Sequence, residues 1–72
     1  MQRNWEDLAQ AIVMQAVKDY RLALKVLRRR PDSKRAQEVV EEIERFIRSR
    51  WFSLMYDIDP EQIINRLKEE AT

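Results

Sequence analysis

The residues of this 72-residue chain that could do chemistry are mainly arginine, lysine and carboxylates, because cysteine and histidine are absent. The serine and threonine candidates for a nucleophile therefore lack an imidazole or thiol that could activate or replace them. Glycine is absent as well, which excludes the glycine-rich loops of Walker-type and dinucleotide-binding sites. We therefore expect a non-enzymatic protein without a resident cofactor.

Two groups of acidic residues have spacings that partly match metal-binding motifs. Three glutamates within residues 38–42 share one expected helix, but two-metal sites in helical bundles also need a Glu-x-x-His motif. Acidic residues alternate at 57–61 as at the start of a calcium loop, without its glycine or its distal glutamate. A solvated helix face and helix capping explain these groups better, so we expect no metal site.

Positive charge is concentrated in the middle of the chain. Residues 18–35 carry eight lysines and arginines against two aspartates, which gives +6, whereas the whole chain carries a formal charge of +1. Such a segment suits a phosphate-binding patch. It equally suits a solvated turn whose charges favour the C-terminal end of a helix. The basic patch consists of Arg28, Arg29, Arg30, Lys34 and Arg35.

A second candidate site combines arginines with aromatic residues. In an antiparallel helical hairpin that turns near residue 32, position 20 lies roughly opposite position 44, so Asp19 can form a salt bridge with Arg45 or Arg48. The alternative is that arginine forks bind phosphate while an aromatic ring stacks on a base. Aromatic residues at 51 and 52 are also typical of a core or an interface. The predicted ligand-binding residues are Tyr20, Arg21, Arg45, Arg48 and Trp51.

A long first helix must position both sites. Apolar residues recur at helical spacing between residues 5 and 27, which predicts an amphipathic helix over about 4–29. Asn4 is a suitable N-cap for this helix. Pro31 ends it, because the residue before a proline avoids helical backbone angles.

Two further helices follow. The apolar pattern predicts a second helix over 33–55, capped by Asp32 or Ser33. The Asp-Pro-Glu-Gln sequence at 59–62 has a capping residue, a proline at the first helical position and a glutamine at the third. It predicts a short third helix over 60–70. Residues 1–72 are thus expected to form one all-α domain, a long antiparallel hairpin with a short C-terminal helix.

The chain is short for a monomer that lacks disulfides and metals. A domain of this size buries only about 60–65% of its unfolded surface, and oligomerisation is the remaining way to stabilise it. Met14, Leu22 and Val26 lie outside the main apolar stripe of the first helix, which favours a homodimer of hairpins or a higher homo-oligomer. No apolar run approaches the roughly 20 residues that span a bilayer. The N-terminus does not resemble a secretory signal, so we expect a cytoplasmic protein.

Three stretches of the chain resemble a family of small helical proteins from phages and prophages of Gram-positive bacteria. They are Ala-Val-Lys-Asp-Tyr-Arg-x-Ala-Leu at 16–24, Glu-Arg-Phe-x-Arg-Ser-x-Trp-Phe at 44–52, and the segment from Asp57 to Leu-Lys-Glu-Glu at 67–70. The resemblance covers nearly the whole chain. The sequence departs from the family at Arg50, where an acidic residue is common, and at residues 59–60, where a glycine is usual.

The resemblance implies a compact accessory protein made during infection and acting in the host cytoplasm. Proteins of this kind regulate phage genes or block host defences, and some sequester a nucleotide or oligonucleotide immune signal. The function expected from residues and resemblance together is therefore an anti-defence protein that sequesters an anionic nucleotide or short oligonucleotide. The alternatives are an inhibitor that docks on a host protein through its apolar helical face, and a DNA-binding regulatory accessory that uses the segment 28–35.

Overall fold

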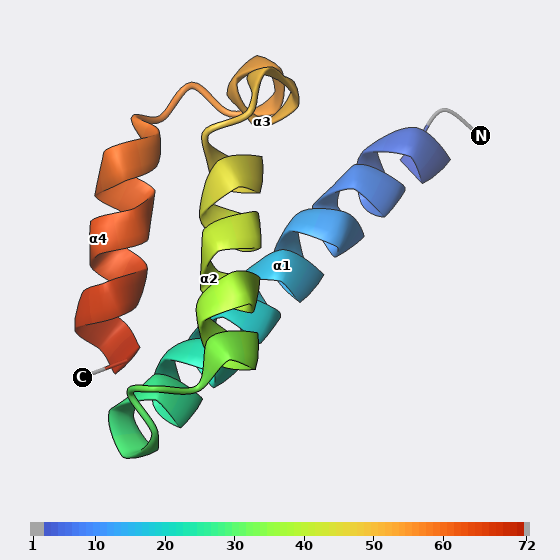
Figure 1. Ribbon diagram of the computed structural model, residues 1–72. Coiled ribbons are helices and arrows are strands. Elements are labelled where there is room, and N and C mark those ends of the chain that lie inside the picture. The colour runs from blue at the N-terminus through green and yellow to red at the C-terminus, as the bar shows by residue number, and fades with distance from the viewer. Residues whose placement is uncertain (1–2, 72) are drawn as a thin grey trace.

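Helix α1 (Arg3–Arg29) is the longest element and forms one side of the molecule (Figure 1). The computed structural model describes residues 3–71 and, among them, the side chains of residues 7–70. The prediction of Asn4 as N-cap is wrong, because Asn4 lies within α1, which begins at or before Arg3. Arg28 and Arg29 occupy the last turn of α1, where positive charge interacts favourably with the helix dipole.

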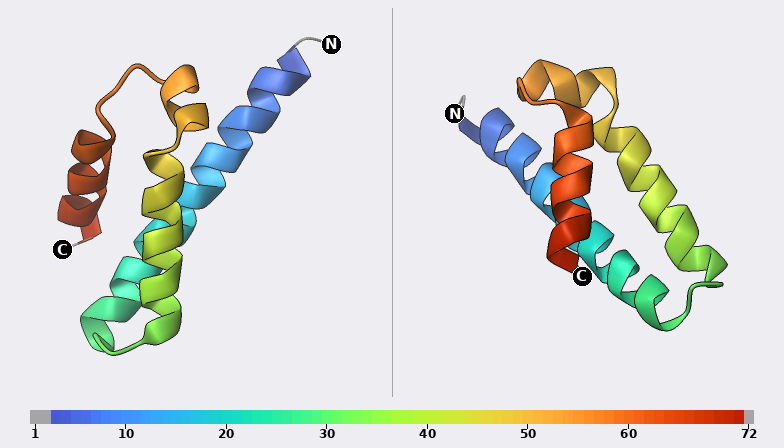
Figure 2. Two further views of the ribbon diagram at one scale, coloured as in Figure 1. Left: turned by 45° about the horizontal axis from the view of Figure 1, so that its top comes forward. Right: turned by 90° about the vertical axis from the view of Figure 1, so that its left-hand side faces the viewer.

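Helix α2 (Lys34–Ile47) runs back antiparallel to α1, as the hairpin prediction required (Figure 1). Ser33 is its N-cap, and the Ser33 hydroxyl accepts a hydrogen bond of 3.3 Å from the backbone N–H of Ala36. The prediction of a cap at Asp32 or Ser33 is thereby confirmed for Ser33. The two helices lie close together near the turn, whereas the N-terminal end of α1 lies apart from α2 (Figures 1 and 2).

The prediction of one continuous helix over 33–55 is wrong, because the chain turns sharply after Ile47. Arg48 forms the C-cap of α2, and its backbone N–H donates to the carbonyl oxygen of Glu44 at 3.0 Å. Ser49 has extended backbone angles and caps helix α3 (Arg50–Met55), its hydroxyl accepting from the N–H of Phe52 at 3.3 Å. This turn allows Phe52 to enter the core instead of continuing along the outside of α2.

Helix α4 (Pro60–Ala71) corresponds to the predicted helix over 60–70. The Asp59 carboxylate accepts from the N–H of Glu61 at 3.0 Å, and the Asp59 carbonyl oxygen accepts from Gln62 at 3.1 Å. The predicted start signal is therefore confirmed. Over residues 3–71 the chain forms four helices and no strand, with α4 packed against both α1 and α2 (Figure 2).

The core is small and draws on all four helices. It is completed by half-buried apolar side chains, among them Val17 and Leu24 of α1 and Val40 of α2. Because each helix contributes at least one buried side chain, none of the four can leave without exposing apolar surface. The central buried residues are Tyr20, Ile47, Phe52, Ile64 and Leu67.

The molecule is elongated, with principal dimensions of 44 × 22 × 19 Å. Its radius of gyration is 13.2 Å, whereas a compact domain of this length has about 11 Å. The difference reflects the length of α1, whose N-terminal end diverges from α2 (Figure 1). Among the described residues, no helix is both long and apolar enough to cross a bilayer.

Candidate functional site

The hairpin register places Tyr20 of α1 against Glu44 of α2, the position expected opposite it. The Tyr20 hydroxyl donates a hydrogen bond of 2.7 Å to the Oε2 atom of Glu44. The tyrosine is 0% exposed, so its ring is unavailable for stacking on a base, and this predicted role of Tyr20 is wrong. Burial, and then the hydrogen bond to the Glu44 carboxylate, raise the pKa of Tyr20 above its ordinary value and keep the hydroxyl protonated.

Arg48 forms a fork on a carboxylate of its own chain. Its Nε and Nη2 atoms lie 2.6 and 3.0 Å from the two carboxylate oxygens of Glu61 in α4. This hydrogen bonding raises the pKa of Arg48 and lowers the pKa of Glu61. Arg48 Nη1 and Lys68 Nζ also lie 3.6 Å from the two oxygens of Glu44. The guanidinium expected to bind phosphate therefore connects α2 to α4.

Arg21 and Asp19 likewise have partners within the chain. The Nη2 atom of Arg21 lies 2.7 Å from Oε1 of Glu70 in α4, with both side chains about half exposed. Asp19 accepts a hydrogen bond of 2.9 Å from the amide of Gln15, one turn earlier on α1. The predicted ion pair of Asp19 with an arginine of α2 is therefore wrong.

Arg45 and Arg48 come together at a shallow hollow of about 550 Å³ on α2. Glu41 and Glu44 line the same hollow and balance the two arginines, so the site has little net charge for an anion. Trp51 is half-buried and packs on Phe46 with ring centroids 5.5 Å apart. Of the five predicted ligand-binding residues, the hollow thus includes only Arg45 and Arg48.

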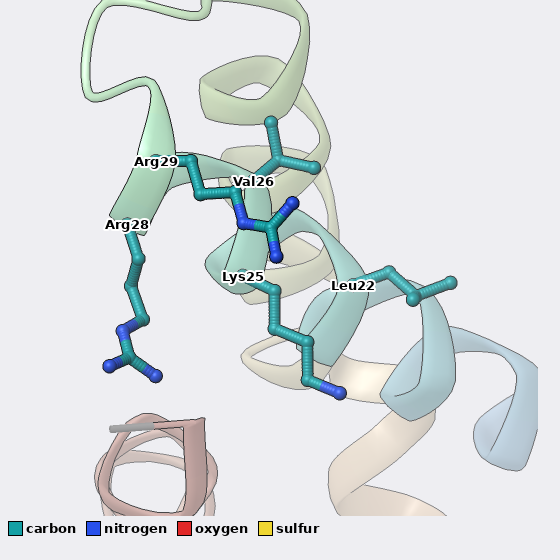
Figure 3. Close-up of a pocket in the computed structure, with 5 residues that line it drawn as sticks. All are labelled: Leu22, Lys25, Val26, Arg28 and Arg29. Carbon is teal, nitrogen blue, oxygen red and sulfur yellow. The ribbon is translucent and has the colours of Figure 1, made fainter.

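A more basic site lies at the C-terminal end of α1, in a groove of about 640 Å³. Its lining residues are Leu22, Lys25, Val26, Arg28 and Arg29, and we call it the basic groove. Figure 3 shows the side chains of Lys25 and Arg29 extending over the groove, whereas Arg28 points away from Arg29. Among the residues that the structure describes, neither Lys25 nor Arg29 has an acidic partner.

Lys25 was not among the residues predicted to bind a ligand. Its spacing of four residues from Arg29 was visible in the sequence and places both charges on one helix face, where they repel each other. The negative end of the helix dipole compensates part of this repulsion. An anion bound between the two cations would relieve the rest, so the basic groove is the better candidate for an anionic ligand.

The remaining basic residues surround the turn of the hairpin. Arg30 and Lys34 are exposed. Arg35 borders a separate groove of about 390 Å³ between α1 and α2, which we call the apolar groove. Most of its lining side chains are apolar, namely Leu22, Ala23, Val26, Ala36 and Val39, with Asp19, Ser33 and Arg35 at its edges.

No protein-family model, curated protein or solved structure matches this chain. The resemblance to small phage and prophage proteins therefore depends on the three quoted stretches alone. Across the described residues, acidic side chains do not gather in threes in a way that could hold a metal ion. The arrangement of charge on α1 is consequently the main guide to function.

Proposed function

We propose that the protein is a non-enzymatic, homo-oligomeric binding protein that holds a phosphate-bearing ligand, a nucleotide or a short oligonucleotide, and sequesters it. The observation that carries this proposal is the pair formed by Lys25 and Arg29 over the basic groove. The phage resemblance supports sequestration of a host defence signal as the purpose.

The ligand is expected in the basic groove and not at the residues that the sequence analysis predicted. Arg21 and Arg48 already bind Glu70 and Glu61, so a phosphate would have to displace a carboxylate before either arginine could bind it. Within the described part of the chain no carboxylate binds Lys25 or Arg29, so a phosphate has none to displace there. Leu22 and Val26 line the same groove and give it an apolar side next to the two cations.

The first test is native mass spectrometry of the protein purified from cells, followed by denaturation to release any bound molecule. Binding is then measured with a fluorescently labelled single-stranded oligonucleotide and with nucleoside mono-, di- and triphosphates. Affinity should fall steeply with salt, because the bound phosphates exchange with counterions. Failure to bind any of these probes at low salt would contradict the proposal.

The site is tested with the variant Lys25→Gln/Arg29→Gln. Loss of a charge-assisted contact of roughly 1.5 kcal/mol weakens binding by about tenfold, so the double variant should lose at least that factor. The matched control is Arg45→Gln/Arg48→Gln, which removes the same charge from the hollow on α2 and should bind normally. If the control loses binding and the first variant retains it, the ligand occupies the hollow instead.

A second candidate function is docking on a host protein. It is favoured by large apolar side chains that remain exposed outside α1, of which Leu54 is 77% and Ile58 51% exposed. Apolar docking depends only weakly on ionic strength, whereas phosphate binding weakens steeply. Binding of a partner protein that persists in high salt and is lost in Leu54→Glu would favour this candidate.

A further inference from the structure

Helix α1 carries a second apolar stripe that the fold leaves uncovered. Leu8, Ile12, Leu22 and Val26 are 58, 47, 55 and 43% exposed, although large apolar side chains gain free energy by leaving water. This stripe is distinct from the face with Tyr20 and Ala23, which the other helices cover. Together with two polar residues between them, Gln15 and Asp19, the four apolar residues form what we call the seam.

The spacing of the seam is that of a coiled coil. Along Leu8, Ile12, Gln15, Asp19, Leu22 and Val26 the steps are alternately four and three residues. This alternation is the heptad pattern that keeps one stripe of a helix facing a partner helix. The seam runs from residue 8 to residue 26, which is about 27 Å of helix. A neighbouring helix is therefore the partner that fits it.

The seam is also symmetric about its midpoint. Val17 is the midpoint of the seam along α1. Three pairs of seam residues lie at equal sequence distances on either side of this midpoint, namely Gln15 and Asp19, Ile12 and Leu22, and Leu8 and Val26. A twofold axis perpendicular to α1 at this level brings each residue opposite its counterpart in an antiparallel second copy. Apolar residues then meet apolar residues at both ends, which is the self-complementarity that an isologous interface requires.

The polar residues complement each other in the same register. Gln15 already donates to Asp19 of its own chain at 2.9 Å. A glutamine amide has two N–H donors, so the remaining donor can serve Asp19 of the second copy. A polar layer in the middle of an apolar seam favours one register and one orientation over the others. Here it favours the antiparallel arrangement about Val17.

The apolar groove explains how the two ends of the seam are covered. Leu22 and Val26 lie beside Ala36 and Val39 of α2 in this groove, close to the hairpin turn. Leu8 and Ile12 lie in the N-terminal half of α1 instead, and their side chains are about half exposed. In an antiparallel dimer, Leu8 and Ile12 of each copy lie along the apolar groove of the other copy.

We propose that two copies of the chain associate through antiparallel α1 helices, with the twofold axis at the level of Val17. The four helices α1 and α2 of both copies then enclose the seam. Leu22 and Val26 also line the basic groove, so α1 of the second copy forms a wall of that groove. This last consequence rests on the proposed ligand-binding function, whereas the dimer itself does not.

The dimer is tested on the intact chain without nucleotide, by sedimentation equilibrium over a range of protein concentrations. We expect twice the chain mass of 8.8 kDa. Ile12→Glu and Leu22→Glu should each weaken association at least about tenfold, because a buried charge without a partner is strongly unfavourable. Leu54→Glu is the matched control, since Leu54 is 77% exposed and lies outside the seam. A monomer at all concentrations, or equal effects of seam and control variants, would overturn the proposal.

Disulfide formation tests the orientation of the two α1 helices directly, because the chain contains no cysteine of its own that could compete. In the proposed dimer, position 8 faces position 26 of the other copy, whereas the two positions 8 are about 27 Å apart. A disulfide requires Cα atoms within about 7 Å. Leu8→Cys and Val26→Cys should therefore form a linked dimer when mixed and oxidised, and neither should do so alone. Linkage of Leu8→Cys to itself would show a parallel pair and contradict the proposal.

These experiments separate the dimer from the ligand. Loss of nucleotide binding in Lys25→Gln/Arg29→Gln with an intact dimer would leave the interface proposal standing. A monomeric protein that still binds nucleotide would refute the interface and leave the ligand proposal standing.

Discussion

Tyr20 has its ring in the core and its hydroxyl on the Glu44 carboxylate. Replacing Tyr20 by phenylalanine removes only the hydroxyl oxygen. The ring of Tyr20 belongs to the buried core with Ile47, Ile64 and Leu67, and Tyr20→Phe keeps this ring. The variant loses only the hydrogen bond of 2.7 Å from the tyrosine hydroxyl to Glu44. Because the acceptor is a carboxylate, this hydrogen bond contributes about 1.5–3 kcal/mol to stability.

The contacts that Glu44 keeps in Tyr20→Phe determine how much stability the variant is expected to lose. Arg48 and Lys68 still approach the carboxylate at 3.6 Å, and the Glu44 side chain is 16% exposed to solvent. The Glu44 carboxylate is therefore not left without partners in the variant. We accordingly expect a loss of stability at the lower end of the range, about 1.5–2 kcal/mol. For a domain of this size each kcal/mol corresponds to a Tm shift of about 4–8 °C. We expect Tyr20→Phe to lower Tm by about 6–16 °C.

The assays are thermal and urea unfolding at neutral pH, followed by far-UV circular dichroism. Both proteins are kept at one concentration because association shifts the apparent stability. Glu44→Gln and the double variant complete a mutant cycle that isolates the coupling between the two side chains. We expect a coupling of about 1 kcal/mol or more. A loss below about 0.5 kcal/mol in Tyr20→Phe, or a coupling near zero, would refute the stabilising role of this hydrogen bond.

Three further predictions concern alkaline stability, the fork of Arg48 and the break after α2. The fold raises the pKa of the Tyr20 hydroxyl, so this hydroxyl contributes its full stabilisation below the unfolded pKa of about 10 and loses it as pH rises above 10. Above about pH 10 the urea midpoint should therefore fall more steeply with pH for the native sequence than for Tyr20→Phe. Arg48→Gln should raise the lowered pKa of Glu61 towards its ordinary value, and an unchanged titration of the Glu61 carboxyl by NMR would contradict the fork. Ser49→Ala removes the cap of α3 and should cost about 1 kcal/mol in urea unfolding; no change would show that the cap adds no stability.

Much of the helical architecture could be predicted because the signals that specify it are local. The cap at Ser33 and the start of α4 after Asp59 depend on hydrogen bonds that span two or three residues. Helical spacing of apolar residues predicted the antiparallel hairpin, and the hairpin length predicted that position 20 lies opposite position 44. The spacing of the seam residues on α1 can also be read from the sequence, whereas their exposure is seen only in the structure.

The break between α2 and α3 could not be predicted from the same signals. Apolar residues continue at helical spacing through Phe46, Ile47 and Trp51, and a serine at position 49 does not by itself end a helix. The chain turns there because Phe52 then reaches a buried position in the core, to which α4 contributes Ile64 and Leu67. That gain depends on residues more than ten positions away.

The composition and periodicity of the sequence determined the helical class, the hairpin and the concentration of positive charge near the turn, because each depends on neighbouring residues. Only the tertiary structure decided which charges remain available to a ligand. Packing of α4 brings Glu70 to Arg21 and Glu61 to Arg48, and leaves Lys25 and Arg29 without an acidic partner among the described residues. An arginine binds a phosphate or a carboxylate with the same fork, so its role depends on which anion the fold places within reach.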